Sequence, residues 1–164
     1  EPTEALLLGG HTALLHEGRV TQFGPTSEIY RHPKDLLSAQ VFSDPPINVA
    51  PVQKKGDRIV LSDTVSWQAE GDIRTIADGA YTIGIRPHHI GPAESGSQPV
   101  PIEGEVLVTE ISGSESVVHF RLADGAWVSQ SHGVHAIEVG EHARLFADVS
   151  KAMLFGPDDR LVAA

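Results

Sequence analysis

The chain has nine histidines, a residue type that commonly binds metals, and no cysteine. Neutral imidazole is the commonest metal ligand in proteins. His88 and His89 are adjacent, so on a strand they would point to opposite faces, and His132 and His135 share a glycine-containing loop. No H-E-x-x-H or other metal-ligand spacing occurs. We therefore expect solvated loop histidines and no metal site.

A serine, a carboxylate and a histidine also occur close together, at Ser114, Glu115 and His119. Nothing around them resembles a nucleophile elbow or an oxyanion-hole turn. Gly113, Ser114 and Glu115 instead have the composition of a hairpin turn. These residues predict no hydrolytic centre.

Arg86 ends a predicted strand and is followed by Pro87. Proline fixes the backbone there, so the guanidinium is held where it could meet a planar anion. Alternatively, Arg86 pairs with one of the many carboxylates. The sequence leaves both interpretations open.

Phosphate-binding loops are missing, because the chain has neither G-x-x-x-x-G-K-[ST] nor G-x-G-x-x-G after a strand. Nucleotide binding by this chain alone is not expected. Trp67 and Trp127 are lone aromatics on predicted strands, and we interpret them as packing residues rather than as platforms for a sugar.

The charge balance narrows the classes of partner. The 164 residues include 12 Lys and Arg against 22 Asp and Glu, which gives a net charge of −10 with neutral histidine. Nucleic acids and anionic lipids need an excess of cations, so neither is an expected partner. The lack of cysteine excludes thiol catalysis and disulfides. No apolar run approaches the roughly 18 residues of a membrane span.

The first 46 residues read as a small α/β unit. Residues 1–8 look like part of a helix cut from something longer, and 12–24 predict a hairpin around Glu17-Gly18. A helix with a Ser/Thr cap is expected from 25 to 30, and another over 34–42 that buries Leu36, Leu37, Val41 and Phe42. Pro45-Pro46 ends the helical pattern. We therefore expect one domain over residues 1–46 and another over 47–164.

The rest of the chain reads as mainly β. In residues 117–122, Val118, Phe120 and Leu122 alternate with their neighbours, as expected of a half-buried strand. The predicted strands are 58–61, 65–69, 80–86, 102–110, 116–122, 126–131, 143–149 and 153–155. Many short strands predict a barrel or a sandwich. The segment 91–101 is rich in Gly, Pro and Ser, which predicts a flexible connector between two β subdomains.

Five motifs, in this order, resemble the ATP-binding proteins of ABC importers for sugars and polyols. Residues 1–5 (E-P-T-E-A) are similar to the stretch after that family's switch-loop histidine. Residues 17–49 (E-G-R-V-T-Q-F-G…E-I-Y-R-H-P…D-P-P-I-N-V) resemble the end of its ATPase domain. Residues 81–90 (Y-T-I-G-I-R-P-H-H-I) are similar to its G-I/V-R-P-E-H strand, and 104–125 and 143–158 resemble its TOBE domain. The resemblance covers essentially the whole chain.

The resemblance implies tandem OB-like (TOBE) β barrels with a short α/β stub. It implies a C-terminal fragment that serves as the regulatory and dimerisation domain of an importer for sugars, polyols or glycerol phosphate. ATP and Mg²⁺ would bind the ATPase part of the parent, so this fragment would hold no cofactor and hydrolyse no ATP. The implied partners are a second copy, the permease subunits and a regulatory protein. The implied location is the cytoplasmic face of the plasma membrane.

The same resemblance suggests where contacts would be made. Strands 102–122 and 143–155 would supply the dimer surface, with Gln68, Arg121 or Trp127 at its rim. The candidates for ligand or regulatory contact are Arg86, Ser114, Glu115 and His119. His88 stands where the family usually has glutamate. The alternative is a freestanding OB-type protein that binds a small oxyanion or sugar.

Overall fold

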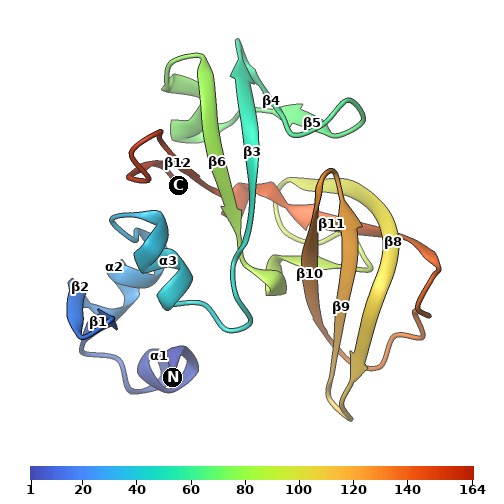
Figure 1. The fold of residues 1–164 in the computed structure, drawn as a ribbon, viewed down its shortest axis with the longest axis horizontal. Coiled ribbons are helices and arrows are strands. Elements are labelled where there is room, and N and C mark those ends of the chain that lie inside the picture. Colours follow the sequence, from blue (N-terminus) through green and yellow to red (C-terminus); the bar gives the residue numbers. More distant parts are fainter.

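The computed structural model describes residues 1–164, which form a small α/β unit and two β sheets (Figure 1). The helices are α1 (Pro2–Leu8), α2 (Thr26–Arg31) and α3 (Leu36–Val41), with the 3₁₀ turns η1 (Gly71–Thr75), η2 (Pro87–His89) and η3 (Val149–Lys151). The strands are β1 (His11–His16), β2 (Arg19–Pro25), β3 (Asn48–Lys55), β4 (Arg58–Val60), β5 (Ser66–Gln68), β6 (Gly79–Ile85), β7 (Ile90–Gly91), β8 (Pro99–Ile111), β9 (Glu115–Leu122), β10 (Gly125–His132), β11 (His142–Asp148), β12 (Met153–Phe155) and β13 (Leu161–Ala163). No helix has the length and apolar character that crossing a membrane requires.

The N-terminal unit contains the expected hairpin and helices, with two differences. Glu17 and Gly18 both have positive φ (48° and 75°), as a tight β1–β2 turn requires. The predicted Ser/Thr cap of α2 is wrong, because Pro25 occupies the cap position and the Thr26 hydroxyl donates to backbone carbonyls of the α1–β1 loop. The predicted buried face of α3 is also wrong at Leu37, which is exposed while Ser38 and Ala39 are buried.

The mainly β architecture is confirmed. One sheet has the order β13-β12-β6-β3-β4-β5 and the other β10-β9-β8-β11-β7. In the second sheet the hydroxyl of Ser129 on β10 donates to the carbonyl oxygen of Ile90 on β7 (2.6 Å), so its two edges meet and it nearly closes into a barrel. Sequence reasoning missed β3, β7 and β13 as separate strands.

The sequence suggested that the segment 91–101 separates two β subdomains, and this prediction is wrong. The segment joins β7 to β8, and both of these strands flank β11 in the same sheet. Its last residues belong to β8. The Gly/Pro-rich composition therefore marks a crossover within the barrel.

The two sheets share one apolar core of 18 buried residues, which includes Ile59 and Ile83 from one sheet and Phe120 and Leu145 from the other. Their relative position is also fixed by polar contacts. The Asn48 side chain donates to the carbonyl oxygen of Val128 (2.8 Å) and accepts from its N–H (2.7 Å). The Trp127 indole donates to the carbonyl oxygen of Val49 (3.2 Å). Asn48 thus replaces a neighbouring strand along the edge of β10.

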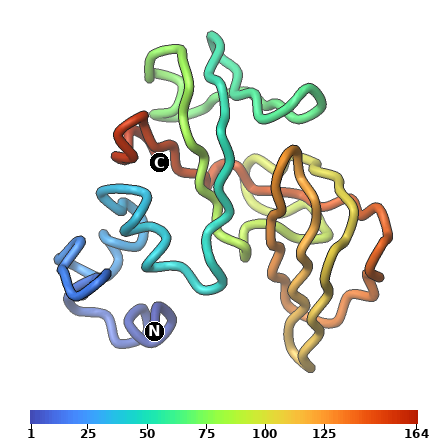
Figure 2. The backbone as a smooth tube through the Cα atoms, viewed as in Figure 1, coloured from blue at the N-terminus to red at the C-terminus, as the bar shows by residue number.

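The C-terminal segment returns from the barrel to the N-terminal unit, as the red end of the tube shows (Figure 2). The Leu36 N–H donates to the carbonyl oxygen of Asp159 (2.8 Å), and the Leu161 N–H donates to that of Lys34 (3.1 Å). Ala39 of α3 is buried in one cluster with Ile47, Met153 and Phe155. The N-terminal unit therefore packs on the last strands of the chain.

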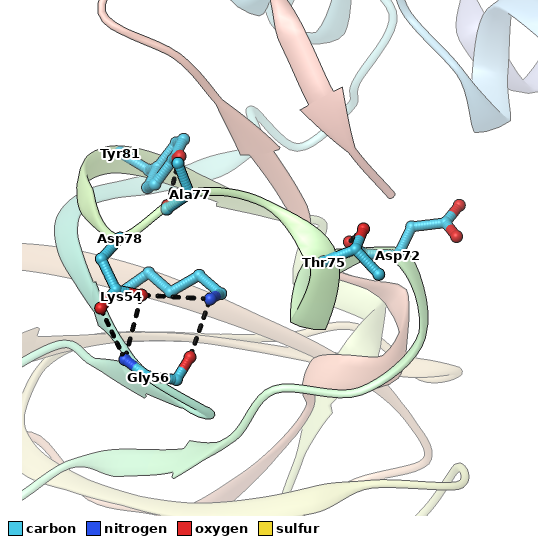
Figure 3. Close-up of polar contacts among 7 residues, drawn as sticks. All are labelled: Lys54, Gly56, Asp72, Thr75, Ala77, Asp78 and Tyr81. Atoms are coloured by element: carbon cyan, nitrogen blue, oxygen red, sulfur yellow. Dashed lines mark hydrogen bonds and ion pairs between the residues drawn. The ribbon is translucent and has the colours of Figure 1, made fainter.

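A buried lysine holds the turn between β3 and β4 (Figure 3). The Lys54 ammonium donates to the carbonyl oxygen of Gly56 (2.7 Å) and lies 3.3 Å from a carboxylate oxygen of Asp78. The Asp78 carboxylate also accepts from the Gly56 N–H (3.0 Å). This backbone hydrogen bond, followed by the contact with Lys54, lowers the pKa of Asp78.

We expect Lys54→Met to lower the free energy of unfolding by about 1 to 2 kcal/mol, because the Gly56 carbonyl loses its charged donor. Urea unfolding followed by circular dichroism measures this. Lys55→Met, at the exposed neighbouring position, is the matched control and should change little. Equal losses in the two variants would show that the Lys54 contacts do not stabilise the turn.

Candidate functional site

Two clefts meet at Arg86, where the N-terminal unit, η2 and the barrel come together. The larger, of about 550 Å³, lies between α1, α2 and the β9–β10 face, and Arg86, Glu115, Gln130 and His132 contribute to its wall. The smaller, of about 350 Å³, lies between the end of α2, η2, η3 and β12. Arg86 and His88 line both clefts.

Arg86 has no carboxylate partner, so the alternative in which it pairs with an acidic side chain is wrong. Its guanidinium carbon lies 3.8 Å from the centre of the Tyr30 ring, a cation–π geometry, and Nη2 donates to the Tyr30 carbonyl oxygen (2.8 Å). Arg86 is only 5% exposed, and Nε is buried without a hydrogen-bond partner. Burial lowers the pKa of Arg86 and raises that of Tyr30.

The histidine pair follows the end of strand β6 and does not lie on a strand. His88 and His89 belong to η2, and their ring centres are 4.0 Å apart. His88 Nε2 also lies 3.4 Å from the Tyr30 hydroxyl. Burial lowers the pKa of both histidines, with added repulsion from Arg86 at His88 and from His88 at His89, whose pKa falls to about 4.

The other predicted site residues do not converge on Arg86 as a group. Glu115 lines the larger cleft, where it accepts a hydrogen bond from Gln130 (3.0 Å). Ser114 lies exposed in the β8–β9 turn. His119 is half-buried in the middle of β9, opposite Val108 and Val128 of the flanking strands. No group of three or more histidine or carboxylate side chains is placed to hold a metal ion.

Sequence reasoning missed most of the smaller cleft. Tyr30, Arg31 and Lys151 line it together with the η2 histidines, although more than a hundred residues of chain separate Arg31 from Lys151. Only the Arg86–His89 stretch carried a signal, through the proline after Arg86 and the unusual His88. No pattern in the sequence places the end of α2 next to η3.

Known proteins are similar to both the N-terminal unit and the β part of this chain. Residues 83–155, which run from β6 to β12 and include the whole barrel, match the TOBE domain family. The sulfoquinovosyl glycerol transport ATP-binding protein of Agrobacterium fabrum is 31% identical over 159 residues, which are 94% of this chain and 44% of the relative. Residues 83–155 are thus a TOBE domain, and the chain is similar over nearly its whole length to ATP-binding proteins of ABC importers.

Two further relatives are also named as import ATP-binding proteins. The xylose/arabinose import ATP-binding protein of Haloferax volcanii is 29% identical, over 86% of this chain and 38% of its own length. The sn-glycerol-3-phosphate import ATP-binding protein of Brucella abortus is 26% identical, over 98% of this chain and 44% of its own length. The chain thus spans less than half of the curated relatives it matches.

The histidine pair of this TOBE domain should make its stability depend on pH. A histidine whose pKa is lower in the folded than in the unfolded state stabilises the fold when neutral, and this stability is lost as pH falls between the two values. For His89 that window runs from the ordinary value of about 6.5 down to about 4. We expect the free energy of unfolding to fall across it by roughly 1 to 2 kcal/mol from His89, since the ring is partly solvated.

Urea unfolding at a series of pH values tests this expectation. His89→Gln, which keeps a neutral side chain, should flatten the slope between about pH 6.5 and 4. His11→Gln, on the exposed hairpin, is the control and should keep the slope of the unmodified chain. An unchanged slope in His89→Gln would contradict the account of His89.

Proposed function

We propose that this chain is the C-terminal regulatory and dimerisation part of the ATP-binding subunit of an ABC importer for sugars, polyols or glycerol phosphate. Residues 1–46 would be the end of the nucleotide-binding domain and 47–164 the TOBE domain. The observation that carries the proposal is the match itself, which takes in 86–98% of this chain but only 38–44% of its importer relatives. The chain also lacks a phosphate-binding loop.

The surface of the N-terminal unit supports this placement. Leu7, Leu8 and Phe23 are 83%, 87% and 68% exposed, and Leu15 and Val20 of the hairpin are also largely exposed. An apolar face of this kind is normally covered by another part of the protein. We propose that the ATPase part of the parent covers it, binds ATP and Mg²⁺, and contacts permease subunits at the cytoplasmic side of the membrane.

Fewer residues can contribute to the dimer surface than the sequence suggested, because some of them are buried. Trp127 and the β12 residues 153–155 are buried, so they cannot contribute to a rim or a surface. Four exposed apolar residues remain at one end of the barrel, on β8 and in the loop before β11: Val108, Ile111, Val134 and Val139. The loop lies against β8, since the Gly140 N–H donates to the carbonyl oxygen of Val106 (2.8 Å). We propose that this apolar end pairs with its counterpart across a two-fold axis.

The isolated chain should therefore form dimers, with a mass twice the 17.5 kDa of the monomer, and should hydrolyse no ATP. Ile111→Asp should shift the mass toward that of the monomer, because a dimer would bury two unpaired carboxylates. Light scattering after size-exclusion chromatography measures the mass, and phosphate release measures hydrolysis.

Val20→Asp is the matched control, since it adds the same charge to an exposed valine of the N-terminal hairpin. It should leave the dimer intact. A monomeric chain, or an Ile111→Asp variant that remains dimeric, would argue against this surface. ATP turnover by the chain would contradict the assignment of hydrolysis to another part of the parent.

A freestanding binder of a small oxyanion or sugar is the second candidate. The cationic lining of the smaller cleft favours an anionic ligand in particular. This candidate predicts that the protein in its source cells is no longer than the present chain.

A further inference from the structure

The smaller cleft is cationic although the chain as a whole is strongly acidic. Arg31, Arg86 and Lys151 line it, together with His32, His88 and His89. No side chain in its wall carries a carboxylate, although Ala164, the last residue of this chain, also lines it, whereas the chain has a net charge of −10. Cations gathered on a concave surface produce a positive potential there. This potential attracts anions even though the net charge of the chain is negative.

Among the cations of this wall, Arg86 would be stabilised most by a bound anion. Its guanidinium is almost fully buried, and a buried charge is unfavourable unless an opposite charge compensates it. The Tyr30 ring covers one face and the Tyr30 carbonyl oxygen takes one N–H, but both groups are uncharged. Nε has no acceptor at all. The charge of Arg86 is thus left without an opposite charge among the side chains of the cleft.

The carboxylate that acts on this cluster is already engaged. Asp148 raises the pKa of His89 slightly against the larger effect of burial, but its Oδ1 accepts from the Ser150 hydroxyl (2.6 Å) and from the Gln98 N–H (3.2 Å). It lies in the η3 cap and does not pair with Arg86. Asp148 therefore orders η3, which carries Lys151, and leaves the cations of the cleft unpaired.

We propose that this cleft binds a phosphate group, either as the free ion or as the ester of a small metabolite, through Arg31, Arg86 and Lys151. A planar guanidinium with two adjacent N–H groups matches phosphate oxygens, and lysine adds a mobile point charge. The volume of about 350 Å³ leaves space beyond a bare ion for a small organic group. The larger cleft fits an anion less well, because Asp44 and Glu115 contribute to its wall.

The existence of this site does not depend on the proposed function. Only its role, as the ligand contact of a regulatory domain, rests on that proposal. The bound group would lie between α2 of the N-terminal unit and η2 and η3 of the β part, so it would tie the two parts together. Binding of a phosphate-bearing metabolite would thereby affect residues 1–46, the part of the chain that continues the nucleotide-binding domain.

Isothermal titration calorimetry of the chain at about pH 7 and fixed ionic strength tests the site, with inorganic phosphate, glucose 6-phosphate and glucose as probes. Phosphate or its ester should bind and glucose should not. The double variant Arg31→Gln/Lys151→Gln should bind on the order of tenfold more weakly or worse, since two charge-assisted contacts are lost. Both positions are exposed, so the fold should not depend on them.

The matched control is Lys55→Gln/Arg74→Gln, which removes the same charge from exposed positions of the β3–β4 turn and η1. It should bind like the unmodified chain. His88→Glu should abolish binding, because it places a carboxylate beside Arg86 in the position of the ligand. The imidazole signals of His88 and His89 should shift in NMR spectra as phosphate is added.

Tighter binding of glucose 6-phosphate than of inorganic phosphate would identify an ester as the ligand, and equal binding would show that the phosphate group suffices. Absence of binding at millimolar phosphate, or equal binding by the Arg31/Lys151 variant and the control, would overturn the proposal. These results are independent of the dimer mass, so the failure of this site and the failure of the proposed dimer can be told apart.

Discussion

The contact between Asn48 and the backbone of Val128 is the constraint on which the rest of the structure depends. An edge strand such as β10 has N–H and C=O groups that need partners, and Asn48 supplies both with one side chain. It sits at the first residue of β3, directly after the proline pair that ends the N-terminal unit. Asn48 and the Trp127 indole, which donates to the Val49 carbonyl oxygen, therefore fix the orientation of the six-stranded sheet against the barrel. The shared apolar core of 18 buried residues supplies most of the attraction between the two sheets.

Placing the two sheets in this way determines the junction at Arg86. Strand β6 pairs with β3 and ends at Ile85, so the next residue, Arg86, lies beside Tyr30 of the N-terminal unit and in one cleft wall with Lys151. Tyr30 from the end of α2 packs on the guanidinium, while α3 packs on β12. The junction is thus polar and partly unsatisfied at Arg86 but apolar around Ala39 and Phe155. The apolar contacts hold the N-terminal unit on the β part, while the cationic groups around Arg86 still face a cleft.

Local patterns in the sequence were sufficient for much of the fold. The alternation in β9, the Glu17-Gly18 turn and the proline pair each act over a few residues, and the structure has the strand, hairpin and break that they predict. Long-range arrangement was not predictable in this way. The crossover at 91–101 has the composition of a linker, and the basic cleft is built from residues whose proximity depends on the whole topology. Arg86 was identified as a candidate from the adjacent proline, but its lack of a carboxylate partner follows only from the packing of Tyr30.

We propose that these residues are one part of an importer ATPase subunit, in which a TOBE barrel pairs the subunits and a cleft between the N-terminal unit and the β part receives a ligand. The most direct test is an immunoblot of cell fractions from the source organism with an antibody to residues 48–164. The account predicts a membrane-associated band much larger than 17.5 kDa. A soluble band near 17.5 kDa would contradict it and would favour a freestanding ligand-binding protein.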